Sequence, residues 1–188
     1  LQALEAAGLI DIVINLSWLG EQIEQRLGDG ARFGVRIQYS QEGAIPLETA
    51  GGIIQALPLL GDAPFVVVNA DIWTDYPFAG LPASPTALAH LVLVNNPSHH
   101  PQGDFALNDN RLANSGEQKL TYSGIGVYQP RLFSGLSCGV RPVAPLLRHA
   151  IDRGQVSGEQ YRGQWWDIGT PARLQELDEL LVRGQKIV

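Results

Sequence analysis

The chain has 188 residues, 45% of them hydrophobic, and a formal net charge of −6. This content suits one domain with a sizeable core, while the acidic balance argues against nucleic acid as a partner, because polyanion binding needs a basic surface. Its single cysteine, Cys138, cannot form an internal disulfide, and no stretch resembles a cleavable signal or a bilayer-spanning segment. We therefore expect a cytoplasmic protein without a membrane partner, as a monomer or a small homo-oligomer.

The first part of the chain alternates helical and strand patterns. In order, these predict the end of a helix at 1–8, a buried strand at 11–15, a helix containing Leu19, Ile23 and Leu27, a strand at 35–39, a helix opening at 49–52, and a strand at 65–68 buried on both faces. Such alternation predicts right-handed crossovers and a parallel sheet with helices on both faces.

The second part of the chain is different in character. After an apolar strand at 88–94, short segments suggest hairpins or an antiparallel addition, and a strand at 121–128 contains two glycines that allow a close approach. A helix at 142–151 follows. The stretch 165–171 then predicts a short strand, a turn and the start of an amphipathic helix with Leu174, Leu177 and Leu181, which has Thr170 as its N-cap. No linker divides the chain, so we expect both halves to share one core.

Two acids each follow a strand-like segment and precede a turn. Asp71 stands just beyond the carboxyl end of the strand at 65–68. Ligands of open parallel sheets bind beyond the carboxyl ends of the strands. Taken alone, Asp71 could equally cap the next turn, and Asp167 could belong to a turn before the Thr170 cap. If both acids face one cleft they form a divalent-cation site, because Mg²⁺ is usually held by one or two carboxylates, substrate phosphates and water.

The helix opening at 49–52 contains the small residues Thr49, Ala50, Gly51 and Gly52. Exposed backbone N–H groups there could hold a phosphate, or a base could lie against glycine. Close packing of the helix against a neighbour explains the glycine pair equally well. No lysine follows the glycines, so this is not a Walker motif.

Other candidate groups carry weaker evidence. His99 and His100 are adjacent in a proline-flanked loop, which favours a solvated loop or a substrate contact over a zinc site. Ser123 has no evident base, which leaves serine-based hydrolysis with little support. Trp165 and Trp166 beside Asp167 could wall a cleft.

Four segments, taken together, are similar to the motifs of the sugar-1-phosphate nucleotidyltransferases. They are Leu47-Glu48-Thr49-Ala50-Gly51-Gly52, Val68-Asn69-Ala70-Asp71, Tyr122-Ser123-Gly124-Ile125 and Trp166-Asp167-Ile168-Gly169-Thr170. Their spacing and order agree across nearly the whole chain. Two further stretches, 96–105 and 157–163, resemble the small bacterial N-acetylmuramate 1-phosphate uridylyltransferases of cell-wall sugar recycling.

The resemblance implies an α/β fold with a Rossmann-like, mixed, mostly parallel sheet flanked by helices and a small antiparallel sugar-binding addition, in one nucleotidyltransferase domain over 1–188. It also implies a nucleoside triphosphate donor, namely UTP, N-acetylmuramate 1-phosphate as the acceptor sugar 1-phosphate, Mg²⁺ as cofactor, and release of pyrophosphate. By this similarity, Asp71 and Asp167 are catalytic residues that bind Mg²⁺. The implied nucleotide-binding residues are Glu42, Thr49, Gly51 and Gly52, and the implied substrate-binding residues are Asn69, Asp104, Gly124 and Glu159.

One family feature is not found in these residues. Family members open with a strand and a glycine-rich loop that grips the triphosphate, whereas this sequence begins with what resembles the helix after that loop. We expect such a segment to precede residue 1. A protein confined to these 188 residues is expected to have very weak or no transferase activity.

Two alternatives remain at the level of the sequence. A glycosyltransferase that uses a nucleotide sugar also places acids around a metal at strand ends, although the glycine pair and the Trp-x-Asp-x-Gly-Thr segment suit a nucleotidyltransferase better. A non-catalytic module that binds a nucleotide or a sugar is the second alternative.

Overall fold

The computed structural model describes residues 1–43 and 45–182, and the chain forms two compact units that interleave along the sequence. Unit 1 contains residues 1–65, 77–84 and 129–150, and unit 2 contains 66–76, 85–128 and the chain from Ile151 onward. The single domain over 1–188 stays a prediction, and its residues 183–188 lie outside the described residues.

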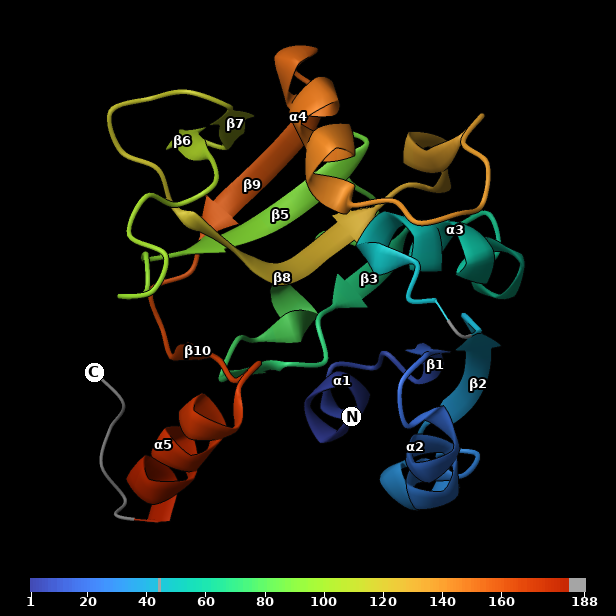
Figure 1. Cartoon of the computed structure of the whole chain (residues 1–188). Helices are drawn as coiled ribbons and strands as arrows, with labels where there is room; N and C mark the ends of the chain where they lie inside the picture. The colour runs from blue at the N-terminus through green and yellow to red at the C-terminus, as the bar shows by residue number, and fades with distance from the viewer. Residues whose placement is uncertain (44, 183–188) are drawn as a thin grey trace. The chain divides into compact units, whose positions relative to one another are not determined.

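Unit 1 combines a two-stranded parallel sheet with helices (Figure 1). Its elements are α1 (Gln2–Ala6), β1 (Asp11–Leu16), α2 (Gly20–Leu27), β2 (Arg36–Gln41), α3 (Glu48–Leu60), short 3-10 helices at Ala31–Phe33, Phe78–Gly80 and Pro130–Phe133, and most of α4 (Val143–Asp152). Asp11 lies opposite Arg36 in the β1–β2 register, and their side chains form an ion pair at 2.7 Å. Helix α3 packs against both strands, as its apolar pattern predicts.

The elements predicted in the first part of the chain are confirmed with two corrections. Leu19 is not inside α2, because it is the exposed residue before the helix, with a left-handed backbone at φ 57°. The predicted burial of β1 is also wrong: Ile12, Val13 and Ile14 are only half-buried. Among the described residues β1 pairs with β2 alone, so its faces have less cover than those of a central strand.

Unit 2 is built on a six-stranded mixed sheet in the order β3-β8-β5-β9-β7-β6 (Figure 1). The strands are β3 (Phe65–Val68), whose first residue belongs to unit 1, β5 (Ala89–Val94), β6 (Ala106–Asn108), β7 (Arg111–Ala113), β8 (Thr121–Tyr128) and β9 (Val156–Gln160). Strand β5 pairs in parallel with β9 and antiparallel with β8. The side chains of Leu91, Val92 and Ile125 are fully buried at the centre of this sheet, which places the core of unit 2 there.

The antiparallel addition expected after Asn95 is present as the β6–β7 hairpin. A second antiparallel pair joins β4 (Ile72–Thr74) to β10 (Trp165–Asp167), and helix α5 (Pro171–Val182) follows β10. The backbone N–H of Arg173 donates to Oγ1 of Thr170 at 3.3 Å, which confirms the predicted N-cap. On α5 only Leu177 of the predicted apolar stripe is buried, whereas Leu174 and Leu181 are exposed, so the prediction for those two is wrong.

The α/β class with a central mixed sheet flanked by helices is confirmed. Two strand predictions need correction. The strands at 11–15, 35–39 and 65–68 do not join in one parallel sheet among the described residues, because β3 pairs with β8 instead. Strand β3 is also half-buried throughout rather than buried on both faces, since it forms an edge of its sheet. Within 1–43 and 45–182, no helix has both the length and the apolarity that crossing a membrane requires.

Candidate functional site: two converging carboxylates in unit 2

The β4–β10 pair brings the two predicted acids together within unit 2. Asp71 immediately precedes β4, and Asp167 is the last residue of β10, where it lies opposite Ile72. The backbone N–H of Ile168 donates to the carbonyl of Asp71 at 2.8 Å, which ties the two segments directly. The pairing of two short strands thus joins acids that are far apart in the sequence.

Gly169 shows that both carboxylates face one small space. A Cβ at this position would lie 3.0 Å from Oδ2 of Asp71 and 3.1 Å from Oδ1 of Asp167. Any side chain at residue 169 would therefore occupy the space that the two acids border. Carboxylate oxygens are the donors that Mg²⁺ prefers, so these residues fit the predicted cation. The residues that the structure describes contain no group of three or more histidine, cysteine, aspartate or glutamate side chains that could hold a metal ion.

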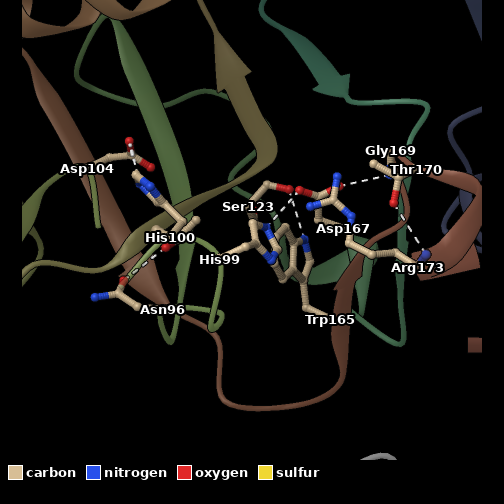
Figure 2. Close-up of polar contacts among 11 residues, drawn as sticks. Asn96, His99, His100, Asp104, Ser123, Trp165, Asp167, Gly169, Thr170 and Arg173 are labelled. Atoms are coloured by element: carbon tan, nitrogen blue, oxygen red, sulfur yellow. Dashed lines mark hydrogen bonds and ion pairs between the residues drawn. The ribbon is translucent and has the colours of Figure 1, made fainter. Parts of the chain in front are cut away.

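Asp167 has three further partners, two of them basic side chains (Figure 2). Nε2 of His99 lies 3.1 Å from its Oδ2, and the Arg173 guanidinium lies 3.2 Å from its Oδ1. The Gly169 N–H donates to the same Oδ1 at 2.9 Å. The turn-forming role that the sequence allowed for Asp167 is therefore real, and it coexists with the convergence of the two acids.

The acids line a cavity of about 290 Å³ in unit 2. Its lining residues are Asn69, Asp71, Ile72, His99, His100, Thr121, Tyr122, Ser123, Trp165 and Asp167. Trp165 forms part of the wall, as expected, and its indole Nε1 donates to the carbonyl of Ser123 at 2.9 Å. No lysine or arginine is among the lining residues, although the Arg173 guanidinium contacts the lining residue Asp167.

The loop that carries the two histidines is held by side chains from its own ends. Nε2 of His100 lies 3.2 Å from Oδ1 of Asp104, whose Oδ2 accepts the N–H of Tyr122 at 2.8 Å. The Asn96 amide donates to the carbonyls of Pro101 and Lys119 at 3.0 and 2.9 Å. In Figure 2 the two imidazoles point in different directions, His99 toward Asp167 and His100 toward Asp104. They do not converge on one point, in agreement with the preference against a zinc site.

Of the four predicted substrate-binding residues, only Asn69 lines this cavity. Gly124, at φ +81°, packs against it so closely that a Cβ would lie 2.7 Å from Cγ of Asn69. This explains one of the two glycines of β8, which the sequence linked to a close approach. Asp104 holds the histidine loop, and Glu159 lies outside the cavity lining, with its carboxylate bound by the Tyr76 hydroxyl.

The predicted nucleotide-binding residues all lie in unit 1. The Glu42 carboxylate accepts hydrogen bonds from the Asn15 amide at 3.0 Å and from the Leu47 N–H at 2.8 Å. A Cβ on Gly52 would lie 2.5 Å from both Oε1 of Glu42 and Nδ2 of Asn15. Gly52 is therefore needed to give those side chains room, while Thr49 is exposed.

The expectation of free N–H groups at the start of α3 is wrong for Ala50 and Gly51. The N–H groups of Ala50 and Gly51 donate to the carbonyl of Arg141 at 3.0 and 3.1 Å. A Cβ on Gly51 would lie only 2.2 Å from the carbonyl oxygen of Gly139. The close-packing explanation for the glycine pair is thus correct, and a segment distant in sequence satisfies the amides.

Sequence reasoning missed the contacts of His99 and Arg173 with Asp167. The spacing of Asp167, Thr170 and Arg173 offered one indication, because an N-cap at Thr170 places Arg173 in the first turn of the helix. No local pattern pointed to His99, which lies 68 residues before its partner.

Comparisons with known proteins agree with this fold. The family model described as nucleotidyl transferase matches residues 1–105. The chain is 48% identical over 186 residues to the N-acetylmuramate alpha-1-phosphate uridylyltransferase of Neisseria meningitidis serogroup B, covering 94% of this chain and 80% of that protein. It is 29% identical over 187 residues to the protein of the same name from Caulobacter vibrioides, covering 91% of this chain and 77% of that protein.

Among solved structures, the inositol-1-phosphate CTP transferase of T. maritima aligns with a TM-score of 0.76 at 19% sequence identity, covering 96% of this chain and 79% of that one. HddC from Yersinia pseudotuberculosis aligns with a TM-score of 0.71 at 17% identity, covering 96% of this chain and 82% of that one. These two likenesses support the fold.

The family match and the relative at 48% identity show an enzyme of the nucleotidyltransferase class, and its fold is α/β. The chain belongs to the nucleotidyl transferase family. This membership decides against the glycosyltransferase alternative and against a purely binding module.

Proposed function

We propose that the protein transfers a uridylyl group from UTP to N-acetylmuramate 1-phosphate, giving the nucleotide sugar and pyrophosphate. The observation that carries this proposal is the 48% identity, over 94% of the chain, to a relative named for that activity. We further propose that the reaction requires Mg²⁺, that it takes place in the cytoplasm, and that it is a step in the recycling of cell-wall sugars.

The bond changes of this reaction are simple. A phosphate oxygen of the sugar 1-phosphate attacks the α-phosphorus of UTP, a new P–O bond forms, and the bond from the α-phosphorus to the bridging oxygen breaks with its electrons leaving on pyrophosphate. Positioning and electrostatics supply most of the catalysis in such a displacement. Bound Mg²⁺ offsets the negative charge of the phosphates and of the leaving group.

The residues of this chain have distinct proposed roles. Asp71 and Asp167 would hold the cation with their carboxylates, which border the space at Gly169. Asn69 lines the same cavity and would contact the sugar phosphate, and Asp104 and Glu159 would act near the sugar ring. In unit 1, Glu42, Thr49, Gly51 and Gly52 would lie along the base and ribose, and the missing side chain of Gly52 leaves room for the Glu42 carboxylate.

The reaction is tested by incubating the gene product with Mg²⁺, UTP and N-acetylmuramate 1-phosphate and measuring pyrophosphate. We expect pyrophosphate release to depend on both substrates. Release should be slower when N-acetylglucosamine 1-phosphate replaces the acceptor or when another nucleoside triphosphate replaces UTP. Turnover only with a preformed nucleotide sugar would contradict the proposal and restore the glycosyltransferase reading.

The metal assignment is tested by Asp71→Asn and Asp167→Asn. Each removes one negative ligand but keeps the size of the side chain, so we expect Mg²⁺-dependent activity to fall by about 100-fold or more. Calorimetry of nucleotide-sugar binding with and without Mg²⁺ should show that the metal no longer improves affinity.

Asp109→Asn is the matched control for these variants. Asp109 is an exposed acid of unit 2 in the β6–β7 turn, with φ 56°, a conformation that asparagine tolerates. It should behave as the unchanged protein does. Metal-dependent binding that survives in both cavity variants would rule out the assignment.

A further inference from the structure

Glu159 presents a carboxylate that is fixed at one oxygen. Its Oε1 accepts a hydrogen bond from the hydroxyl of Tyr76, whose side chain lies in the core with 5% of the residue exposed. The Glu159 side chain itself is 44% exposed, so it is far more accessible to solvent than its donor. A buried donor on a partly exposed acceptor is an arrangement that sets the direction of the carboxylate.

The other oxygen of Glu159 has no hydrogen-bond donor in the part of the chain that the structure describes. The nearest basic group is Nε2 of His90, which lies 3.9 Å from Oε2 and is too far for a hydrogen bond. Nδ1 of His90 is engaged by Oγ of Ser157 at 2.9 Å. Burial lowers the pKa of His90, so the imidazole tends to stay neutral beside the carboxylate. Oε2 is thus left to accept a hydrogen bond from a ligand.

Tyr76 is in turn held in place by a second tyrosine. The rings of Tyr76 and Tyr161 meet edge to face, with centroids 5.0 Å apart and an interplanar angle of 81°. The Tyr161 hydroxyl donates to Oδ1 of Asp75, which also accepts the N–H of Gln164 at 2.7 Å. These contacts fasten the segment after β4 to the segment between β9 and β10.

Both hydroxyls are protonated donors at any physiological pH. Burial, with the nearby Glu159 carboxylate, raises the pKa of Tyr76 well above its ordinary value. Burial and the Asp75 carboxylate raise the pKa of Tyr161 to about 12. The Tyr76 hydroxyl therefore keeps its proton and is always the donor in its hydrogen bond to Glu159.

We propose that Tyr76 is a positioning residue for acceptor recognition: its hydroxyl fixes Oε1 of Glu159 so that Oε2 accepts a hydrogen bond from a hydroxyl or amide N–H of the sugar. This inference rests on the proposed function, and it adds a residue that lies outside the cavity lining and is buried away from any ligand. Neither Tyr76 nor its partner Tyr161 needs to touch the substrate.

The variant Tyr76→Phe isolates the hydroxyl, because it keeps the ring and its contact with Tyr161. We expect the KM for the sugar 1-phosphate to rise by about 10-fold, as for loss of a hydrogen bond to a charged group, with kcat and the KM for UTP unchanged. A general structural defect would instead change all three constants. Glu159→Gln and the double variant complete a cycle, in which the second substitution should add little to the first.

Tyr39→Phe is the matched control. Its hydroxyl donates to the carbonyl of Gly28 at 2.6 Å in unit 1, so the variant also loses one tyrosine hydrogen bond, but none that involves Glu159. Its KM for the acceptor should equal that of the unchanged protein.

Binding measurements separate failure of this inference from failure of the proposed function. If the unchanged protein binds neither UDP nor UDP-N-acetylmuramate and releases no pyrophosphate, the proposed function is wrong, and the inference with it. If it binds both while Tyr76→Phe binds the nucleotide sugar as tightly as before, the inference alone is wrong. Support requires weaker binding of the nucleotide sugar and unchanged binding of UDP.

A second measurement covers the case in which Tyr76→Phe does not fold. In the unchanged protein, the buried Tyr76 hydroxyl proton bound to a carboxylate should give a resolved NMR resonance. UDP-N-acetylmuramate should shift it, and UDP should not. An equal response to both ligands would overturn the inference.

Discussion

At the scale of single residues, Gly169 determines whether the two acids can share a ligand. The position of its missing Cβ lies about equally far from Oδ2 of Asp71 and Oδ1 of Asp167. Its N–H also donates to Asp167, so the same residue orients one acid and leaves space for both. A glycine is required here for the room it leaves, since its φ is not in the left-handed region.

We predict that Gly169→Ala impairs metal binding more than folding. The new methyl group would sit about 3 Å from both carboxylate oxygens, so one acid must move. We expect the apparent Mg²⁺ affinity in a pyrophosphate-release assay to fall by about 10- to 100-fold, the range typical of changes beside metal ligands. Gly80→Ala is the control, because a Cβ there would have nothing within 4 Å. Equal Mg²⁺ dependence in both variants would refute the prediction.

The site could be predicted from sequence only as far as its local patterns reach. Asp71 and Asp167 were accessible because Asp71 follows the apolar strand β3 by a few residues and Asp167 ends the aromatic strand β10. The contact of His99 with Asp167 was not, because an imidazole in a loop has no periodic pattern that names its partner. The Tyr76–Glu159 bond was missed for the same reason: it joins two strand ends that neighbour each other only after folding.

At the scale of elements, the start of α3 shows how a helix end can be satisfied by a distant segment. Two of its first N–H groups donate to one carbonyl, that of Arg141, and Leu47 accepts the Arg141 N–H in return at 2.8 Å. The helix is thereby clamped to the 139–141 segment of the same unit. Gly51 permits this approach, and neither the carbonyl nor the distance could be predicted from the motif itself.

We predict that Gly51→Ala destabilises the protein, the reverse of the usual effect in a helix. Alanine normally raises helix stability over glycine by up to about 1 kcal/mol. Here the Cβ would lie 2.2 Å from the Gly139 carbonyl oxygen, a backbone atom that cannot rotate away. The free energy of unfolding in urea should fall by about 1–3 kcal/mol, the usual result of overpacking.

Thr49→Ala, at an exposed position of the same helix, is the comparison and should be neutral or slightly stabilising. If Gly51→Ala were as stable as Thr49→Ala, the close approach at Gly139 would be wrong.

The elements themselves were largely accessible from apolar periodicity and from caps. Strand β8 and helix α3 lie where the pattern placed them, because β-branched runs and glycine stops act locally. Pairing was less accessible: β3 joins β8 rather than β1 or β2, a choice made by contacts over long stretches of chain. Exposure was misjudged on α5, where Leu174 and Leu181 face solvent although their spacing suits an apolar stripe.

At the scale of the whole molecule, the loss of stability in acid depends on titratable side chains that are buried on folding, where their charged form is disfavoured. His90 is one of them: its side chain is 13% exposed, and burial lowers its pKa from the ordinary value of 6.5. The unfolded chain therefore takes up a proton at this residue at a higher pH than the folded chain does. Stability is greatest above about pH 6.5 with respect to this group and falls as the pH drops toward the lower pKa of the folded state.

We predict that His90→Gln weakens this acid sensitivity. Glutamine does not titrate, so the decline in melting temperature between pH 6.5 and pH 5 should be shallower than in the unchanged protein. Circular dichroism melts across that range provide the measurement. His149→Gln, at an exposed position on α4, should leave the slope as it was. A slope that is identical in all three proteins would mean that His90 is not buried as described.

The β4–β10 pair also has a consequence for how the protein is made. Among the described residues β4 has β10 as its only ladder partner, and β10 is synthesised about ninety residues later. On the ribosome, Asp71 and β4 therefore emerge long before the strand that completes their site. We therefore expect a translation product that stops before Trp165 to carry one acid and an unpaired β4, and so to lack the paired carboxylates altogether rather than to hold them less well.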